Sequence, residues 1–152
     1  MIEKVSKWNV ACLFKNVAIV FMLITVVTGC WRSERQAEVN MLEITADTTV
    51  VNALYFRVRQ RCETCDAVAS IAQKTIETAY AGNSKVRYIE IENSLKTNEA
   101  LVEKYEVMWN ALIIVKGDDA IDITQRAFLN AVNKPQILEN LIKEEVDKRI
   151  RD

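Results

Sequence analysis

Residues 50–65 read VVNALYFRVRQRCETC, and this stretch decides the fold because it joins a strand-like run to a pair of cysteines. Residues 50–58 are rich in β-branched and aromatic side chains, which favour a strand. Residues 66–80 then place apolar side chains at helical spacing, which predicts a helix. Cys62 and Cys65 therefore fall on the first turn of a helix that follows a strand.

The start of a helix favours the reactive form of a cysteine. Unpaired backbone N–H groups and the helix dipole stabilise the thiolate there, and the thiolate is the form that attacks disulfides. Nearby charges act on Cys62 in both directions, because Arg59 and Arg61 favour its thiolate whereas Glu63 and Asp66 oppose it.

Two interpretations of the cysteine pair stay open. The pair either takes part in thiol–disulfide chemistry or forms a static disulfide that pins the end of the helix. The closed loop is short, and loop-closure entropy grows with loop length, so a purely stabilising disulfide would contribute weakly.

The N-terminus predicts export from the cytoplasm. Lys4, Lys7 and Lys15 precede the uncharged apolar run of residues 17–27, which is followed by small residues and Cys30. This order is typical of a secretory signal peptide. The apolar run is roughly half of the ~20 residues that a membrane-spanning helix needs.

Residues 27–30 read VTGC and closely resemble the lipobox of bacterial lipoproteins. The resemblance implies that Cys30 receives a lipid and becomes the first mature residue. We therefore expect a signal peptide at 1–29, a tether at 30–48 and a folded domain at 49–152, held at the extracytoplasmic or periplasmic face of a bacterial membrane. The alternative is an uncleaved anchor that begins near Val10 and leaves Lys15 in lipid, which is costly.

Export changes the number of cysteines that matter. Cys12 would leave with the signal peptide and Cys30 would carry lipid, so Cys62 and Cys65 would remain as one disulfide or one redox-cycling pair. Residues 30–152 suffice for one modest core and are too few for two domains.

Composition excludes several classes of function. The chain has no histidine, which rules out Cys–His catalysis, histidine acid–base chemistry and histidine-containing zinc sites. A metal or iron–sulfur site would have to bridge two chains or use carboxylates, so we expect no metal and no cofactor. The 20 Lys+Arg and 21 Asp+Glu give a net charge of −1, and no basic stripe suggests a nucleic-acid partner.

The rest of the chain predicts three further strands and two further helices. Residues 85–92 alternate apolar and polar side chains, and residues 111–115 are apolar throughout, as in a central strand. A turn at 117–119 leads to a strand at 120–124 that forms an antiparallel hairpin with 111–115. Helices are predicted after Asn98, which is interpreted as a cap, and at 135–150; residues 39–44 are compatible with an extra edge strand.

The predicted order is β-α-β-α-β-β-α with a central mixed sheet and C-x-x-C after the first strand. This order resembles the thioredoxin-like fold over residues 49–150, and residues 103–107, EKYEV, are similar to the Lys-Tyr-Gly-Ile stretch before the third core strand of thioredoxins. The resemblance implies that Cys62 is the nucleophile and that Cys65 resolves the mixed disulfide.

The chain also departs from the thioredoxin pattern. Where that fold places a cis-proline this chain has Trp109-Asn110-Ala111, with trans geometry expected at Asn110, and Phe56 falls where thioredoxins carry a buried acid. Trp109 either contacts substrate beside the thiols or caps the core. Five residues are candidates for tuning the thiols or contacting substrate: Arg61, Glu63, Thr64, Trp109 and Asn110.

Other charged positions are interpreted as solvated. Glu90 and Glu92 are expected on an exposed strand face, and Arg57, Arg59 and Arg61 at an exposed strand edge.

The expected function is that of a membrane-tethered thiol–disulfide oxidoreductase that acts through Cys62 and Cys65 on thiols or disulfides of exported proteins. The alternative is a thioredoxin-like binding or chaperone module whose disulfide is structural or vestigial. The sequence indicates no particular electron donor.

Overall fold

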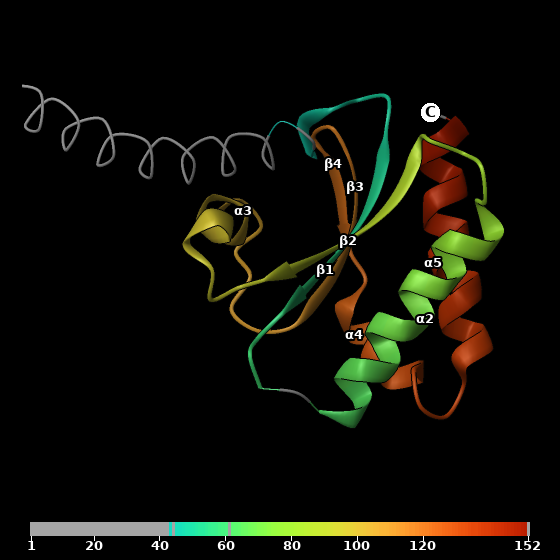
Figure 1. The fold of residues 1–152 in the computed structure, drawn as a ribbon. Helices are drawn as coiled ribbons and strands as arrows, with labels where there is room; N and C mark the ends of the chain where they lie inside the picture. The colour runs from blue at the N-terminus through green and yellow to red at the C-terminus, as the bar shows by residue number, and fades with distance from the viewer. Residues whose placement is uncertain (1–42, 44, 61, 152) are drawn as a thin grey trace, which may run out of the picture. The chain divides into compact units, whose positions relative to one another are not determined.

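A computed structural model describes residues 43, 45–60 and 62–151. Over these residues the chain alternates strands and helices, with helices on both faces of one sheet (Figure 1). The elements in chain order are β1 (Val51–Arg57), α2 (Glu63–Ala79), β2 (Val86–Glu92), the 3-10 turn η1 (Lys96–Asn98), α3 (Glu99–Lys104), β3 (Ala111–Lys116), β4 (Asp119–Asp122), α4 (Thr124–Asn130) and α5 (Pro135–Arg151).

The four described strands form one mixed sheet in the order β2-β1-β3-β4. β1 pairs in parallel with β2 and antiparallel with β3, so that Leu54 lies between Ile89 and Ile113, and β3 pairs antiparallel with β4. The predicted hairpin of the last two strands is thereby confirmed. This arrangement is a thioredoxin-like α/β fold, as the sequence predicted.

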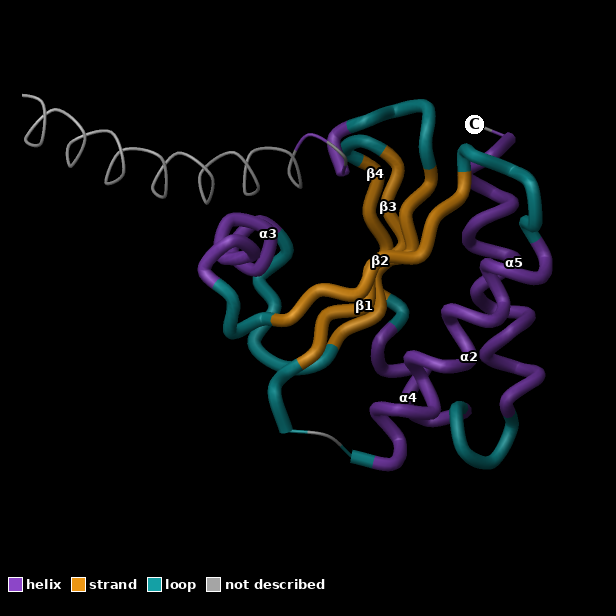
Figure 2. The backbone as a smooth tube through the Cα atoms, in the orientation of Figure 1, coloured by secondary structure: helices purple, strands orange, loops and turns teal. Residues whose placement is uncertain are grey.

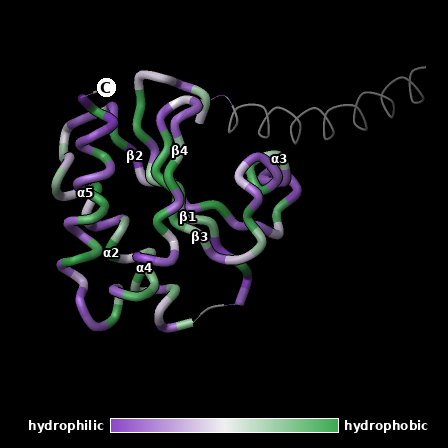
Figure 3. The backbone as a smooth tube through the Cα atoms, turned by 180° about the vertical axis from the view of Figure 1, so that it is seen from behind, coloured by the Kyte–Doolittle hydropathy of each residue, from purple (hydrophilic) through white to green (hydrophobic). Residues whose placement is uncertain are grey.

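The two faces of the sheet are covered by different helices. α2, α4 and α5 lie on one side and α3 on the other (Figure 1), and the tube in Figure 2 shows the strands between these two layers. Alternate residues of β1 serve the two cores: Ala53 and Tyr55 face α2, whereas Leu54 and Phe56 face α3. β1 is therefore mostly apolar, and Figure 3 shows hydrophobic stretches mixed with hydrophilic ones along the strands of the sheet.

The dithiol helix begins and ends close to its predicted bounds. α2 runs from Glu63 to Ala79 and buries Val68, Ala72 and Ile76 against the sheet. Gly82, just beyond its end, has a φ of 80°, in the left-handed region that glycine adopts at low cost.

Helix α4 was not predicted. It is only seven residues long and mostly polar, so its sequence carries little periodic signal. It is stabilised instead by tertiary contacts: Ala127 is fully buried, and the Thr124 hydroxyl accepts the Leu112 N–H of β3 at 2.9 Å.

The prediction that Asn98 caps the following helix is confirmed for its position but is wrong for its side chain. Asn98 stands at the cap position of α3, but its side chain makes no capping bond. Its amide instead donates to the Glu92 carbonyl at 2.9 Å, because the side chain is buried between the end of β2 and α3.

Residues 1–42, which include Cys12 and Cys30, lie outside the described residues, so the signal peptide and the lipid anchor stay predictions. Of the extra edge strand expected at 39–44, only Glu43 is described, and it is helical, like Thr45 and Ala46. Among the helices of the described part of the chain, none combines the length and the hydrophobicity needed to span a bilayer.

Candidate functional site

Cys62 and Cys65 form a disulfide at the start of α2, with an S–S distance of 2.10 Å and a Cα–Cα distance of 5.1 Å. Cys62 is the N-cap residue, with extended backbone angles (φ −140°, ψ 152°), and its Sγ accepts the Cys65 N–H at 3.1 Å. The sulfur therefore occupies the position at which serine or aspartate usually caps a helix. The predicted placement of the pair at a helix start is confirmed.

The two sulfurs differ in access to solvent. Cys62 is exposed, whereas Cys65 is only 8% exposed because it lies one turn into the helix and faces the sheet. An incoming thiol or disulfide can therefore approach Cys62 more readily than Cys65.

Tyr55 of β1 contacts the same turn of α2. Its buried hydroxyl donates to the Cys65 carbonyl at 2.9 Å. Burial raises the pKa of Tyr55 to about 12, with further contributions from the nearby Glu90 and Asp66 carboxylates. The phenol therefore stays protonated at neutral pH and links the dithiol turn to the central strand.

Sequence reasoning missed Tyr55, which in a strand reads as an ordinary core aromatic. The next residue, Phe56, falls where thioredoxins carry a buried acid; it is fully buried and packs edge-on against Tyr105 on the α3 side of the sheet. The alternation of β1 could have revealed Tyr55, since residues 53 and 55 share the face that α2 covers.

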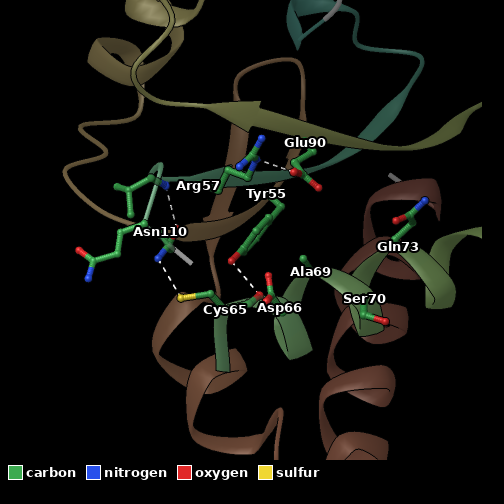
Figure 4. A pocket seen from close by; sticks show the side chains of 11 residues that line it. Tyr55, Arg57, Cys65, Asp66, Ala69, Ser70, Gln73, Glu90 and Asn110 are labelled. Atoms are coloured by element: carbon green, nitrogen blue, oxygen red, sulfur yellow. Dashed lines mark hydrogen bonds and ion pairs between the residues drawn. The ribbon is translucent and has the colours of Figure 1, made fainter. Parts of the chain in front are cut away.

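Asn110 joins three segments at the dithiol (Figure 4). Its Oδ1 accepts the Val58 N–H at 2.9 Å, and its Nδ2 donates to the Sγ of Cys65 at 3.2 Å. Asn110 is half-buried and leads directly into β3. No peptide bond among the described residues is cis, so the trans geometry expected at Asn110 is confirmed.

Trp109 does not cap the core. Its side chain is 72% exposed, and that of the preceding Met108 is 80% exposed. The backbone is nevertheless held, because the Asn93 amide donates to the Trp109 carbonyl at 2.9 Å. Two large apolar side chains therefore project into solvent from the segment that reaches Cys65 through Asn110.

The remaining candidates occupy different positions in the site. Glu63 is exposed on the first turn of α2, and Thr64 is half-buried beside it. Arg59 is exposed in the loop before the dithiol. Arg61 lies outside the described residues.

The prediction of a solvated face is confirmed for Glu90, whose side chain is 40% exposed, whereas Glu92 is half-buried and both glutamates have a partner. Arg57 of β1 lies 2.6 Å from Glu90 and 3.1 Å from Glu92, and the Arg57 side chain is only 27% exposed. The strand register explains this cluster, because Tyr55 stands opposite Glu90 and Arg57 opposite Glu92 on the same face.

A cavity of about 430 Å³ opens between α2 and the strands β1 and β2. Polar side chains contribute much of its lining, among them Tyr55, Gln73, Glu90 and Asn110. Cys65 lines this cavity, whereas the exposed Cys62 does not. Cys65 thus borders a polar cavity although it is only 8% exposed.

Over residues 43, 45–60 and 62–151, no cluster of three or more cysteine, aspartate or glutamate side chains is arranged to hold a metal ion. The chain matches no protein-family model, and no curated protein shows significant similarity to it. Fold and site together define a thioredoxin-like α/β domain with a C-x-x-C disulfide at a helix start.

Proposed function

We propose that the protein is a thiol–disulfide oxidoreductase whose working groups are Cys62 and Cys65. One observation carries this proposal: an exposed cysteine caps the helix and is joined to a partner that is only 8% exposed. A static staple needs no such asymmetry, whereas thiol–disulfide exchange needs one open sulfur to attack and one protected sulfur to resolve.

In the reducing direction the reaction has two displacements. The Cys62 thiolate attacks one sulfur of a substrate disulfide, forms a mixed disulfide and expels the other substrate sulfur as a thiolate. The Cys65 thiolate then attacks the Sγ of Cys62, forms the internal disulfide and releases the second substrate thiolate, and both leaving thiolates take protons from water. The substrate gains two electrons that the dithiol loses, and a thiol donor must return them; the oxidising direction is the reverse.

The local structure favours this role for Cys62. Its sulfur lies where the helix N-terminus offers the Cys65 N–H, a hydrogen bond that strengthens when the sulfur is negative. The exposed Met108 and Trp109 offer apolar surface close to the dithiol, which suits unfolded polypeptide around a substrate cysteine better than a compact folded surface.

The sequence supports a place for this activity in the cell envelope. A lipid on Cys30 would tether the domain to a bacterial membrane at its extracytoplasmic face, and the substrates would be thiols or disulfides of exported proteins. Cys30→Ser should leave an unprocessed precursor, as measured by intact mass. An unmodified Cys30 within a longer N-terminus of the native protein would contradict the tether.

The exposed Met108 and Trp109 also favour a second candidate, a binding or chaperone module that holds unfolded chains without exchanging disulfides. The two candidates differ in one requirement. Binding would survive Cys62→Ser, whereas disulfide reduction would be lost.

A single-turnover assay tests the proposal. The full chain is reduced with dithiothreitol, freed of reductant and mixed with a denatured disulfide-bonded polypeptide. In a background in which Cys12 and Cys30 are both replaced by serine, the otherwise unchanged chain should reduce the substrate, Cys62→Ser should not, and Cys65→Ser should accumulate a mixed disulfide through Cys62. Reduction that persists in Cys62→Ser, or the absence of any mixed disulfide in Cys65→Ser, would overturn the proposal.

A further inference from the structure

The orientation of the Asn110 amide is fixed by a backbone group. The Val58 N–H can only donate, so the Asn110 atom 2.9 Å from it must be the oxygen. The other terminus, 3.2 Å from the Sγ of Cys65, must then be the NH₂ group. The side chain therefore directs an N–H donor at the less exposed sulfur, in the orientation that the strand end imposes (Figure 4).

A fixed donor stabilises the thiolate, thiol and disulfide states of Cys65 to different extents. A hydrogen bond to a negatively charged sulfur is stronger than one to a neutral sulfur, so the amide stabilises the thiolate more than the thiol or the disulfide. The effect is enhanced where water is partly excluded, and Cys65 is only 8% exposed.

We propose that Asn110 is a positioning residue that holds the Sγ of Cys65 toward Cys62 and stabilises the Cys65 thiolate for the resolving step. This inference rests on the proposed function and adds a residue to it. In that step the Cys65 thiolate attacks the Sγ of Cys62 in the mixed disulfide, the bond between Cys62 and the substrate breaks, and the substrate leaves as a thiolate that is protonated by water. The oxidant is the substrate disulfide itself, so a single turnover needs no further reagent.

The first experiment measures how readily Cys65 alone forms its thiolate. In the full chain carrying Cys62→Ser, the pH dependence of iodoacetamide labelling is followed for the tryptic peptide 62–74, in which Cys65 is then the only cysteine. The midpoint of the labelling curve reports the thiolate, whereas the plateau rate reports access, so a change in burial does not disturb the comparison.

Two substitutions of Asn110 should move this midpoint by different amounts. Asn110→Ala removes the donor and should raise the midpoint by about one pH unit, a tenfold loss of thiolate at a pH below both midpoints. Asn110→Asp keeps an acceptor for the Val58 N–H but replaces the donor by a carboxylate oxygen, so it should raise the midpoint further.

Asn93→Ala is the matched control. The Asn93 amide holds the backbone of Trp109, next to Asn110, but it donates its hydrogen bond to a carbonyl and not to sulfur. A purely structural role for Asn110 would make the midpoint follow the loss of stability in all three variants. The proposal instead predicts an unchanged midpoint in Asn93→Ala and a larger shift for aspartate than for alanine.

The second experiment measures the rate of the resolving step in protein that keeps Cys62. At a fixed pH near neutrality, the mixed disulfide between reduced protein and a disulfide-bonded polypeptide should persist about tenfold longer in Asn110→Ala than in wild type. Unchanged midpoints in both Asn110 variants would overturn the inference even if wild type reduces substrate. Failure of wild type to reduce any substrate would overturn the proposed function, while the midpoints would still report the Asn110 contact.

Discussion

The two ends of the sheet use polar side chains in opposite ways. At the β3–β4 hairpin, the Arg149 side chain is 5% exposed and lies 2.9 Å from Asp119 and 3.0 Å from Glu145. The backbone carbonyl of Arg149 accepts a hydrogen bond from the Lys116 ammonium at 2.7 Å. Both the side chain and the backbone of Arg149 therefore bind α5 to the hairpin. At the dithiol end, a phenol and an amide are directed at Cys65, while Met108 and Trp109 face solvent.

The difference indicates that the hairpin end mainly stabilises the fold, whereas the dithiol end carries the cysteine pair. The hairpin end pairs its charges and adds Gly117, whose positive φ of 58° and close approach to Thr48 leave no room for a side chain. The dithiol end keeps apolar surface exposed and directs the Asn110 amide at the Sγ of Cys65 and the Tyr55 hydroxyl at the Cys65 carbonyl. Substitutions at the hairpin end should therefore change stability without changing reactivity, whereas those of Asn110 and Glu63 at the dithiol end should change the reactivity of the cysteines.

The largest effect is expected for Arg149→Ala. This change leaves Glu145, which is only 12% exposed, without its nearest cation, and should lower the free energy of unfolding by about 3 kcal/mol. Urea unfolding of the oxidised protein measures it, and the midpoint of Cys62 labelling should stay unchanged.

Arg126→Ala is the matched control, because Arg126 pairs with the same Glu145 at 3.3 Å but is 51% exposed. It should cost about 0.5 kcal/mol or less. Equal losses in the two variants would contradict the distinction between a buried and an exposed pair.

Tyr55→Phe should have an intermediate effect. It removes the hydrogen bond to the Cys65 carbonyl and should lower the free energy of unfolding by about 1 kcal/mol at pH 7. Since the folded protein raises the pKa of Tyr55 from 10.0 to about 12, it holds the phenol proton more tightly than the unfolded chain does. The stability gained from Tyr55 is full below pH 10 and is lost as the pH rises through 12.

Urea unfolding at several pH values tests this sign. The advantage of wild type over Tyr55→Phe should shrink steadily above pH 10, because Tyr80 and Tyr88, whose pKa values burial also raises, are common to both proteins. An advantage that grows with pH would mean that the buried phenol does not titrate as described.

Glu106→Gly should stabilise the protein. Glu106 has a φ of 52°, the left-handed region that disfavours side chains, at the position where the similar thioredoxin stretch has glycine. Relief of this strain, less the extra freedom of glycine in the unfolded chain, should raise the free energy of unfolding by about 0.5 kcal/mol. Glu103→Gly in α3 is the control and should lower it by up to ~1 kcal/mol, since a helix disfavours glycine.

The smallest effect is expected for Glu63→Gln. Glu63 is exposed on the first turn beside Cys62, and its carboxylate opposes a second negative charge there. The labelling midpoint of Cys62 should fall by roughly 0.3 pH units, an effect kept small by solvent screening. A midpoint that stays constant or rises would show that the carboxylate does not act on the thiolate.

The sequence predicted those features that depend on local pattern. β-branched residues before the dithiol indicated β1, helical spacing after it indicated α2, and the continuous apolar run at 111–115 indicated β3. Contacts that depend on packing could not be predicted from local pattern, because they join distant parts of the chain. Asn110 contacts Val58 and Cys65, which lie 52 and 45 positions away in the sequence, respectively. The exposure of Trp109 likewise depends on how Asn93 holds its backbone, so both interpretations of Trp109 were compatible with the sequence.

The short disulfide lets oxidation and folding be measured against each other. Cys62 and Cys65 are three positions apart, so their disulfide removes little entropy from the unfolded chain. It should stabilise the folded domain by only about 2 kcal/mol, less than half of what a disulfide that closes a hundred-residue loop contributes. The ion pairs of Arg149 and the bond from Tyr80 to Asp147 hold the rest of the domain whatever the state of sulfur. The reduced domain should thus stay folded between turnovers. Oxidation and unfolding then form a closed thermodynamic cycle, in which each 1.4 kcal/mol of difference in stability between the two redox forms corresponds to about 30 mV between the potentials of the folded and unfolded dithiol.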